Sequence, residues 1–143
     1  MTTDPLRIAQ ILVTARTIAV VGLSAKADRP SHDVAHYLQR HGYRIIPINP
    51  TYAGTHILGE PCFATLDDAA ASLARENIRI DLVDCFRRAE AIAPIADAAI
   101  RIGAAVLWMQ LGIINYAAAA KAEAAGLTVV MDRCLKIEHA RRQ

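Results

Sequence analysis

Residues 17–31 read Thr-Ile-Ala-Val-Val-Gly-Leu-Ser-Ala-Lys-Ala-Asp-Arg-Pro-Ser, and this stretch indicates the fold of the chain. Residues 18–21 are an unbroken apolar run, which is typical of a strand buried on both faces in a parallel sheet. Gly22 follows, and the next helical pattern begins only at Ser31, which can cap it. A glycine lets the backbone approach a ligand closely, and the helix behind it offers unpaired N–H groups to an anion. This order therefore predicts a site for nucleotide phosphates.

Outward from this stretch, short apolar runs alternate with helical patterns along the whole chain. Strands are expected at residues 18–21, 43–48, 80–84, 104–109 and 127–131. Helices are expected at residues 6–15, 31–42, 65–75, 88–102, 115–126 and 133–141, with Thr65 and Asn115 as further N-caps. Pro94 belongs in the first turn of its helix, because a proline in mid-helix costs about 3 kcal/mol. Residues 51–62 have no helical period and predict a long loop, a feature that is often functional.

Five buried strands that alternate with helices predict an α/β fold, in which a doubly wound parallel sheet is covered on both faces. We expect one Rossmann-like domain over residues 1–143, with the five strands in the order 3-2-1-4-5. Ligands of such sheets bind beyond the carboxyl ends of the strands at the switch point, which this order puts between the first and fourth strands.

Composition narrows the function further. The chain has 143 residues, of which 54% are apolar and 21% charged, so it predicts a packed domain rather than disorder. The net charge of +2 is too small to indicate nucleic acid or an anionic membrane surface as a partner. Residues 1–10 do not resemble a signal peptide, and no apolar run approaches the ~20 residues of a membrane span. A protein partner or a homo-oligomer stays open.

Cysteine and histidine usage points to a cytoplasmic protein without a metal site. The three cysteines are widely spaced and form neither a disulfide framework nor a CxxC pair, which favours a reducing compartment. His32 and His36 are four residues apart, but without an acidic third ligand this spacing is usually a helix surface.

Small and polar residues follow every expected strand. In chain order these residues are Gly22, Leu23 and Ser24; Asn49 and Pro50; Cys85, Phe86 and Arg87; Gln110, Leu111 and Gly112; and Asp132 and Arg133. The carboxyl ends of parallel strands meet at one edge, so these residues predict a mostly apolar pocket with a few fixed polar groups. For any single one of these residues, a role in turning or capping the chain explains its position as well as a ligand contact does. The convergence of all of them on one edge favours a ligand site.

The loop after the first strand argues against NAD. The dinucleotide fingerprint needs glycine at its first, third and sixth positions, and only Gly22 fits, because serine and alanine occupy the other two. Asn49 stands where a ribose-binding acid is expected, and no Walker lysine follows Gly22. The loop is long and carries Lys26 and Arg29, which can reach additional phosphates. A ligand with more phosphate charge than NAD is therefore favoured, with an NAD(P)-type or other nucleotide as the alternative.

Taken together, the strand-end motifs resemble the single-domain CoA-binding protein family, which is related to the CoA-binding domain of the succinyl-CoA synthetase alpha subunit. The motifs are Val21-Gly22-Leu23-Ser24 with Arg29-Pro30-Ser31, Ile48-Asn49-Pro50, Asp84-Cys85-Phe86-Arg87, Trp108-Met109-Gln110-Leu111-Gly112 and Met131-Asp132-Arg133-Cys134. They appear in the family's order, and the resemblance covers about residues 9–140.

The resemblance implies a Rossmann-like domain that binds coenzyme A at the carboxyl edge of its sheet. The implied contacts are Gly22, Leu23 and Ser24 with the phosphates, Lys26 and Arg29 as counter-charges, Asn49 and Pro50 beside the adenosine, Phe86 and Arg87 over the ligand, and Gln110, Leu111 and Gly112 near the pantetheine arm. The synthetase's second domain, with its phosphorylated histidine, has no counterpart here, so acyl-CoA synthesis by this chain alone is not implied.

No residue set predicts catalysis. Asp84 is expected to accept backbone N–H bonds at a strand end, and Cys85 to be a small buried residue. Cys134 is the more interesting thiol, because a helix N-terminus and the adjacent Arg133 could lower its pKa and let it exchange with the CoA thiol. His139 is expected to cap or to lie on the surface. We therefore predict a binding module with no catalytic residues, and a CoA-dependent enzyme, or a subunit of one, as the alternative.

Overall fold

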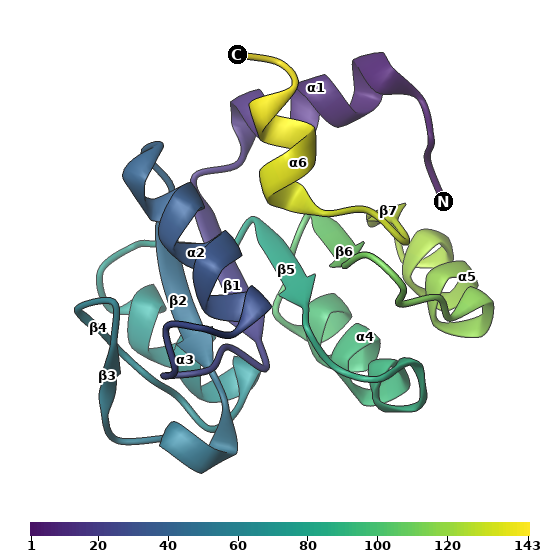
Figure 1. The fold of residues 1–143 in the computed structure, drawn as a ribbon. Coiled ribbons are helices and arrows are strands. Elements are labelled where there is room, and N and C mark those ends of the chain that lie inside the picture. The colour runs from purple at the N-terminus through teal and green to yellow at the C-terminus, as the bar shows by residue number, and fades with distance from the viewer.

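Five parallel strands form the central sheet of the computed structural model, which describes residues 1–143 (Figure 1). They are β1 (Thr17–Val21), β2 (Arg44–Ile48), β5 (Leu82–Cys85), β6 (Val106–Met109) and β7 (Thr128–Val130). The helices are α1 (Pro5–Thr14), α2 (Pro30–Arg40), α3 (Leu66–Ala74), α4 (Ile92–Arg101), α5 (Tyr116–Ala124) and α6 (Leu135–Ala140). This alternation confirms the predicted α/β fold class.

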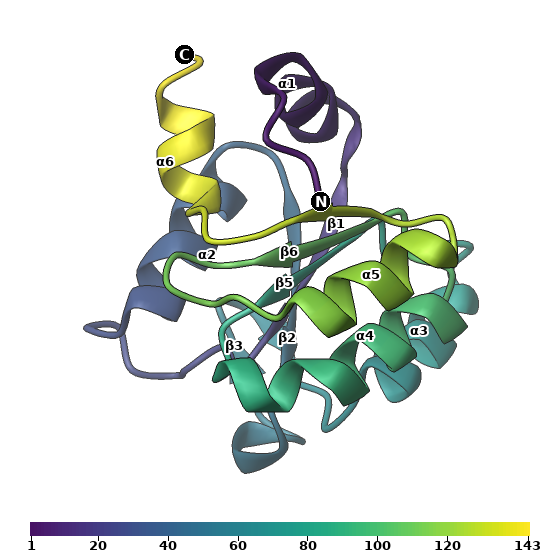
Figure 2. The ribbon, with the colours of Figure 1, turned by 90° about the vertical axis from the view of Figure 1, so that its right-hand side faces the viewer.

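Helices cover both faces of the sheet and create two cores (Figure 2). One core holds 22 buried residues between the sheet and α3, α4 and α5, and the other holds 19 between the sheet and α1, α2 and α6. Neighbouring strand residues such as Ile18 and Ala19 belong to different cores, because side chains alternate between the faces of a strand. This explains why the strands are unbroken apolar runs. None of the helices is both long and apolar enough to span a bilayer.

The predicted strand order is wrong. The observed order is β2-β1-β5-β6-β7, so the third main strand pairs with the first rather than with the second. Pro47 in β2 gives the physical reason. On the outer side of β2, the Phe63 N–H donates to the Pro47 carbonyl at 3.0 Å, and the Asn49 N–H donates to the Phe63 carbonyl at 2.9 Å. Proline lacks the N–H that a full strand on this side would need, so β2 stays at the edge.

Part of the long loop after β2 covers this edge. It contains the 3-10 turn η1 (Pro50–Tyr52) and an antiparallel hairpin of β3 (His56–Ile57) and β4 (Glu60–Pro61), where only irregular chain was expected. Arg44 of β2 donates from its Nε to Glu60 at 3.0 Å, which holds the hairpin against the sheet. Covering an edge in this way blocks its pairing with another chain.

The helix starts follow the sequence with one exception. Thr65 and Asn115 accept backbone N–H bonds at 3.1 and 3.0 Å, as predicted for N-caps. Pro94 is the third residue of α4, preceded by the 3-10 turn η2 (Ala89–Ala91), so it lies in the first turn as expected. Ser31 is not a cap. It is the second residue of α2, and its hydroxyl accepts from the Ser24 N–H at 3.0 Å.

Trp108 of β6 anchors the core beneath α1, α2 and α6. Its ring is fully buried, and its Nε1–H donates to the Arg133 carbonyl at 2.8 Å. We expect Trp108→Ala to lower the free energy of unfolding by about 3–5 kcal/mol, because the lost ring leaves a cavity. Val13→Ala, on the exposed side of α1, is the control and should change stability by less than about 0.5 kcal/mol. Urea denaturation measures both, and equal losses would contradict this role.

Candidate ligand-binding site

The loops that follow β1 and β5 touch at the switch point of the sheet. The Phe86 N–H donates to the Val21 carbonyl at 2.9 Å, and the Gly22 N–H donates to the Ile48 carbonyl at 2.8 Å. Gly22 has a φ of +91°, and a Cβ at this position would lie 2.4 Å from the Phe86 carbonyl oxygen. Only glycine fits such an approach. The switch point therefore lies between β1 and β5, not between the first and fourth strands.

Two clefts meet at Gly22. The first, which we call the polar cleft, has a volume of about 350 Å³. Its walls include Ser24, Lys26, Arg29, Ser31, Tyr52 and Phe86. The second, which we call the apolar cleft, has a volume of about 390 Å³. Its walls include Pro50, Leu66, Arg87, Pro94, Ile95 and Arg101. The polar cleft lies beside α2 and the apolar cleft beside α3 and α4, which cover opposite faces of the sheet (Figure 2).

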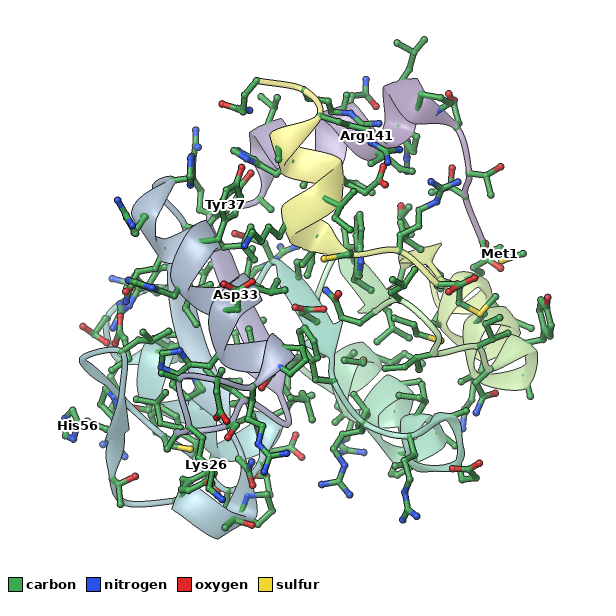
Figure 3. All side chains as sticks on the ribbon, viewed as in Figure 1. Met1, Lys26, Asp33, Tyr37, His56 and Arg141 are labelled. Carbon is green, nitrogen blue, oxygen red and sulfur yellow. The ribbon has the colours of Figure 1, made fainter.

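The clefts carry positive charge that the protein does not neutralise. Lys26, Arg29 and Arg87 have no carboxylate within 4.0 Å, whereas Arg101 is paired with Asp67 at 2.7 Å. The N-terminus of α2, an 11-residue helix, adds a partial positive charge beside the polar cleft. Lys26 lies at the opposite end of the molecule from Arg141, so the basic C-terminal residues are remote from this site (Figure 3). This electrostatic pattern suits a ligand with several negative charges.

Hydrogen bonds between the loops fix the turn after β1. The Ser24 hydroxyl accepts from the Lys26 N–H at 3.1 Å. Asn49 joins this turn to the loop after β2, because its Nδ2 donates to the Leu23 carbonyl at 3.1 Å and its Oδ1 accepts from the Thr51 N–H at 3.0 Å. The Leu23 side chain is fully buried. Leu23 and Asn49 line neither cleft, but they support the turn that does. Asn49 is partly exposed, and its contact with a ligand stays a prediction.

Apart from Leu23 and Asn49, the predicted site residues separate into two groups. Gly22, Ser24, Lys26, Arg29 and Phe86 come together in the polar cleft, and Pro50 and Arg87 border the apolar cleft. The second group, Gln110 to Gly112, follows β6 and lines neither cleft. Gln110 is buried, Leu111 is 65% exposed, and the Gly112 N–H donates to Asp132 at 2.6 Å. Their contact with a ligand stays a prediction.

Tyr52 is a cleft residue that the sequence reasoning missed. It lies in η1 and faces the polar cleft together with Phe86, so two aromatic rings border the cationic side chains. Its loop was expected to be functional because of its length, but nothing in the local pattern distinguishes Tyr52 from its neighbours. Only the turn that starts at Asn49 brings its ring to the cleft.

Asp84 of β5 is sealed beneath the sheet edge. One of its oxygens accepts from Gln110 Nε2 at 2.8 Å, and the other has no partner, so the expected bonds to backbone N–H groups are absent. Burial raises the pKa of this carboxyl to about 8, against the opposing effect of the Gln110 bond. The Cys85 side chain is fully buried, as predicted, and this burial raises the pKa of its thiol well above the usual range.

His139 of the C-terminal helix α6 packs against α2. This residue is buried, and its Nδ1 lies 2.8 Å from the Tyr37 hydroxyl of α2, so the expected capping or surface role is wrong. The ring joins α6 to α2, and its burial together with nearby His41 lowers its pKa. Cys134 is partly exposed at the start of α6, which has only six residues. Its exchange with a CoA thiol stays a prediction.

Residues 16–140 match the family model described as CoA binding domain. The chain belongs to this CoA-binding domain family. The uncharacterized protein YneT of Bacillus subtilis (strain 168) is 40% identical over 133 residues, which cover 93% of this chain and 92% of that one.

Two solved structures extend this family likeness to the fold. The structure of cell-free ID.343 from Thermus thermophilus is 31% identical with a TM-score of 0.86, and the match covers 97% of this chain and 98% of the other. A hypothetical protein from Pyrococcus horikoshii OT3 is 35% identical with a TM-score of 0.87, over 96% and 91% of the two chains. The whole CoA-binding domain, not only its loop motifs, is therefore shared with these proteins.

Two properties of Gly22 require glycine: its positive φ and the close approach of the Phe86 carbonyl. A pair of variants separates their effects on stability. We expect Gly22→Ala to destabilise the CoA-binding domain by about 1–3 kcal/mol more than Gly54→Ala, because the added methyl group meets the Phe86 carbonyl. Gly54 has a similar φ of +86° with nothing within 4 Å of its Cβ position, so Gly54→Ala reports the cost of conformation alone. Thermal and urea denaturation measure both variants. Equal losses would show that the loops do not touch at this point.

Asp84 should make the stability of the CoA-binding domain depend on pH. The folded pKa of about 8 lies above the unfolded value of about 3.9, so between these values the folded state holds a proton that the unfolded chain has lost. This contribution is complete below about pH 4 and is lost as the pH rises to 8. Relative to Asp84→Asn, we expect the free energy of unfolding to fall by up to about 1.4 kcal/mol per pH unit. Urea denaturation from pH 5 to 8 tests this, and identical pH profiles would contradict it.

Proposed function

We propose that this chain binds coenzyme A at the carboxyl edge of its sheet, across the switch point between β1 and β5. The observation that carries the proposal is the meeting of the polar and apolar clefts at Gly22. Coenzyme A combines a flat base, a cluster of phosphates and a long pantetheine arm. A ligand of this kind needs an apolar surface and a cationic surface side by side, as the two clefts offer.

The polar cleft supports the phosphate end of the proposal. The N–H groups at the start of α2 and the turn built by Ser24 and Ser31 form an anion site of the kind found at helix N-termini. Lys26 and Arg29 supply charge that no internal carboxylate neutralises. Coenzyme A carries a 3′-phosphate in addition to its diphosphate, so it requires more counter-charge than NAD does. We propose that Lys26 and Arg29 supply this additional counter-charge to the phosphates.

The apolar cleft supports the adenosine end. Pro50, Pro94 and Ile95 present apolar surface to a ring, and Arg87 borders the same cleft without a carboxylate partner. From the switch point, the pantetheine arm would run past the end of β5 toward the end of β6. Strands of a sheet are about 4.8 Å apart, so β6 lies about 10 Å from β1, within reach of the arm. This path leads to the loop that holds Gln110, Leu111 and Gly112.

We propose binding alone, because the two reactive side chains at the end of β5 are buried. Asp84 and Cys85 have no exposed surface, so neither can contact a ligand in this conformation. A general acid or a nucleophile must lie within hydrogen-bond reach of the group on which it acts. A small-molecule ligand held without chemistry by this chain alone is the function that the site supports best.

Isothermal titration calorimetry with coenzyme A, dephospho-CoA and NAD tests the proposal. We expect coenzyme A to bind and NAD not to bind at equal concentration. At 100 times its dissociation constant, coenzyme A should also add about 2.7 kcal/mol of stability in a thermal shift. Lys26→Ala and Arg29→Ala should each weaken coenzyme A about tenfold or more, because each removes a charge-assisted hydrogen bond. Their effect on dephospho-CoA should be smaller.

Arg40→Ala is the matched control, because Arg40 is an exposed arginine at the far end of the same helix α2. It should leave the affinity for coenzyme A unchanged. Binding of NAD without binding of coenzyme A would overturn the proposal. Equal affinity for coenzyme A and dephospho-CoA would instead show that Lys26 and Arg29 do not recognise the 3′-phosphate.

A further inference from the structure

A third hollow lies at the same edge of the sheet, at the end of β7, and we call it the β7 groove. It has a volume of about 360 Å³ and is separate from the polar and apolar clefts. Ile114 and Tyr116, which follow β6, form one part of it, and Met131, directly after β7, forms another. The groove thus lies at the carboxyl ends of the two strands farthest from β2, and Met1 and Thr3 of the N-terminal segment complete it.

Exposed apolar side chains gather beside this groove. Seven large apolar residues of the chain are exposed, and three of them lie within the seven residues after β6. They are Leu111 at 65%, Ile114 at 40% and Tyr116 at 66% exposure. Single exposed apolar residues are ordinary, but a cluster beside a groove is typical of a surface that contacts an apolar ligand or partner.

Of the charged groups at the groove, the Met1 ammonium and Arg133 are paired with carboxylates, whereas Asp132 is exposed and has no cationic partner. Asp132 accepts the Gly112 N–H at 2.6 Å, and Arg133 lies 3.7 Å from the buried carboxylate of Glu138. These pairs fix the two loops that form the groove. The groove therefore has a polar side, with Thr3 and Asp132, and an apolar side formed by Ile114, Tyr116 and Met131. The apolar side suits a hydrocarbon chain, and the Asp132 carboxylate disfavours an anionic group.

We infer that the β7 groove holds the acyl chain of a CoA thioester. The inference rests on the proposed binding of coenzyme A and names the class of ligand that the site takes. With the phosphates at the end of β1, the pantetheine arm crosses β5 and brings its sulfur toward β6, about 10 Å away. One further strand spacing of about 4.8 Å leads to β7, so an acyl group on that sulfur enters the groove. The preferred ligand is an unbranched, uncharged acyl-CoA rather than free coenzyme A.

Calorimetric titration with coenzyme A and its acetyl, butanoyl, hexanoyl and octanoyl thioesters tests this inference. Each methylene buried in the groove should raise the affinity by up to about fourfold, the equivalent of about 0.8 kcal/mol, and the affinity should level off once the groove is filled. Ile114→Ser and Tyr116→Ser should flatten this dependence on chain length and leave the affinity for free coenzyme A unchanged. Thermal denaturation confirms that both variants fold.

Val13→Ser is the matched control, because Val13 is an exposed apolar residue on α1 that does not line the groove. It should keep the full dependence on chain length. Coenzyme A that binds with the same affinity as all its thioesters would overturn the inference and leave the proposed function intact. A dependence that persists in both groove variants, or disappears in Val13→Ser, would also overturn it. Failure of coenzyme A and every thioester to bind would overturn the proposed function itself.

Discussion

The approach of two backbones at Gly22 is the constraint on which the rest of the site depends. The loops after β1 and β5 are so close that a Cβ on Gly22 would lie 2.4 Å from the Phe86 carbonyl oxygen. This contact exists because β1 and β5 are neighbours in the sheet. It places Phe86 in the polar cleft and Arg87 in the apolar cleft, with Gly22 between them. The glycine is thus required by the protein's own backbone, independently of any phosphate.

Cationic side chains at the site lack carboxylate partners, whereas several of those elsewhere are paired. Lys136 is paired with Asp33 at 2.8 Å and Arg101 with Asp67 at 2.7 Å, whereas Lys26, Arg29 and Arg87 face the clefts without a carboxylate partner. Exposed ion pairs add little stability, so the absence of such partners costs the fold little. The two apolar cores supply the stability instead. The carboxyl edge is therefore free to keep cations for a ligand.

Strand order decides which loops are neighbours at this edge. In the predicted order the loop with Gln110 would adjoin Gly22, but in the structure β5 lies between them. Pro47 carried the information, because a proline inside a strand indicates an edge and the predicted order put that strand in the interior. The observed strand order has a functional consequence. The loop after β6 lies farther along the sheet, and its Ile114 and the following Tyr116 border the β7 groove rather than the phosphate site.

The sequence by itself determined the fold class, the strand–glycine–helix unit at Gly22 and the caps at Thr65 and Asn115, because apolar period, glycine and capping chemistry are local properties. It also determined the family, through short motifs at the strand ends. Only the tertiary structure decided which predicted residues share a cleft, since that depends on strand order. It also showed that Tyr52 borders the polar cleft and that Asp84 is bonded to Gln110 rather than to backbone. Contacts between residues distant in the chain arise from packing, which no local pattern records.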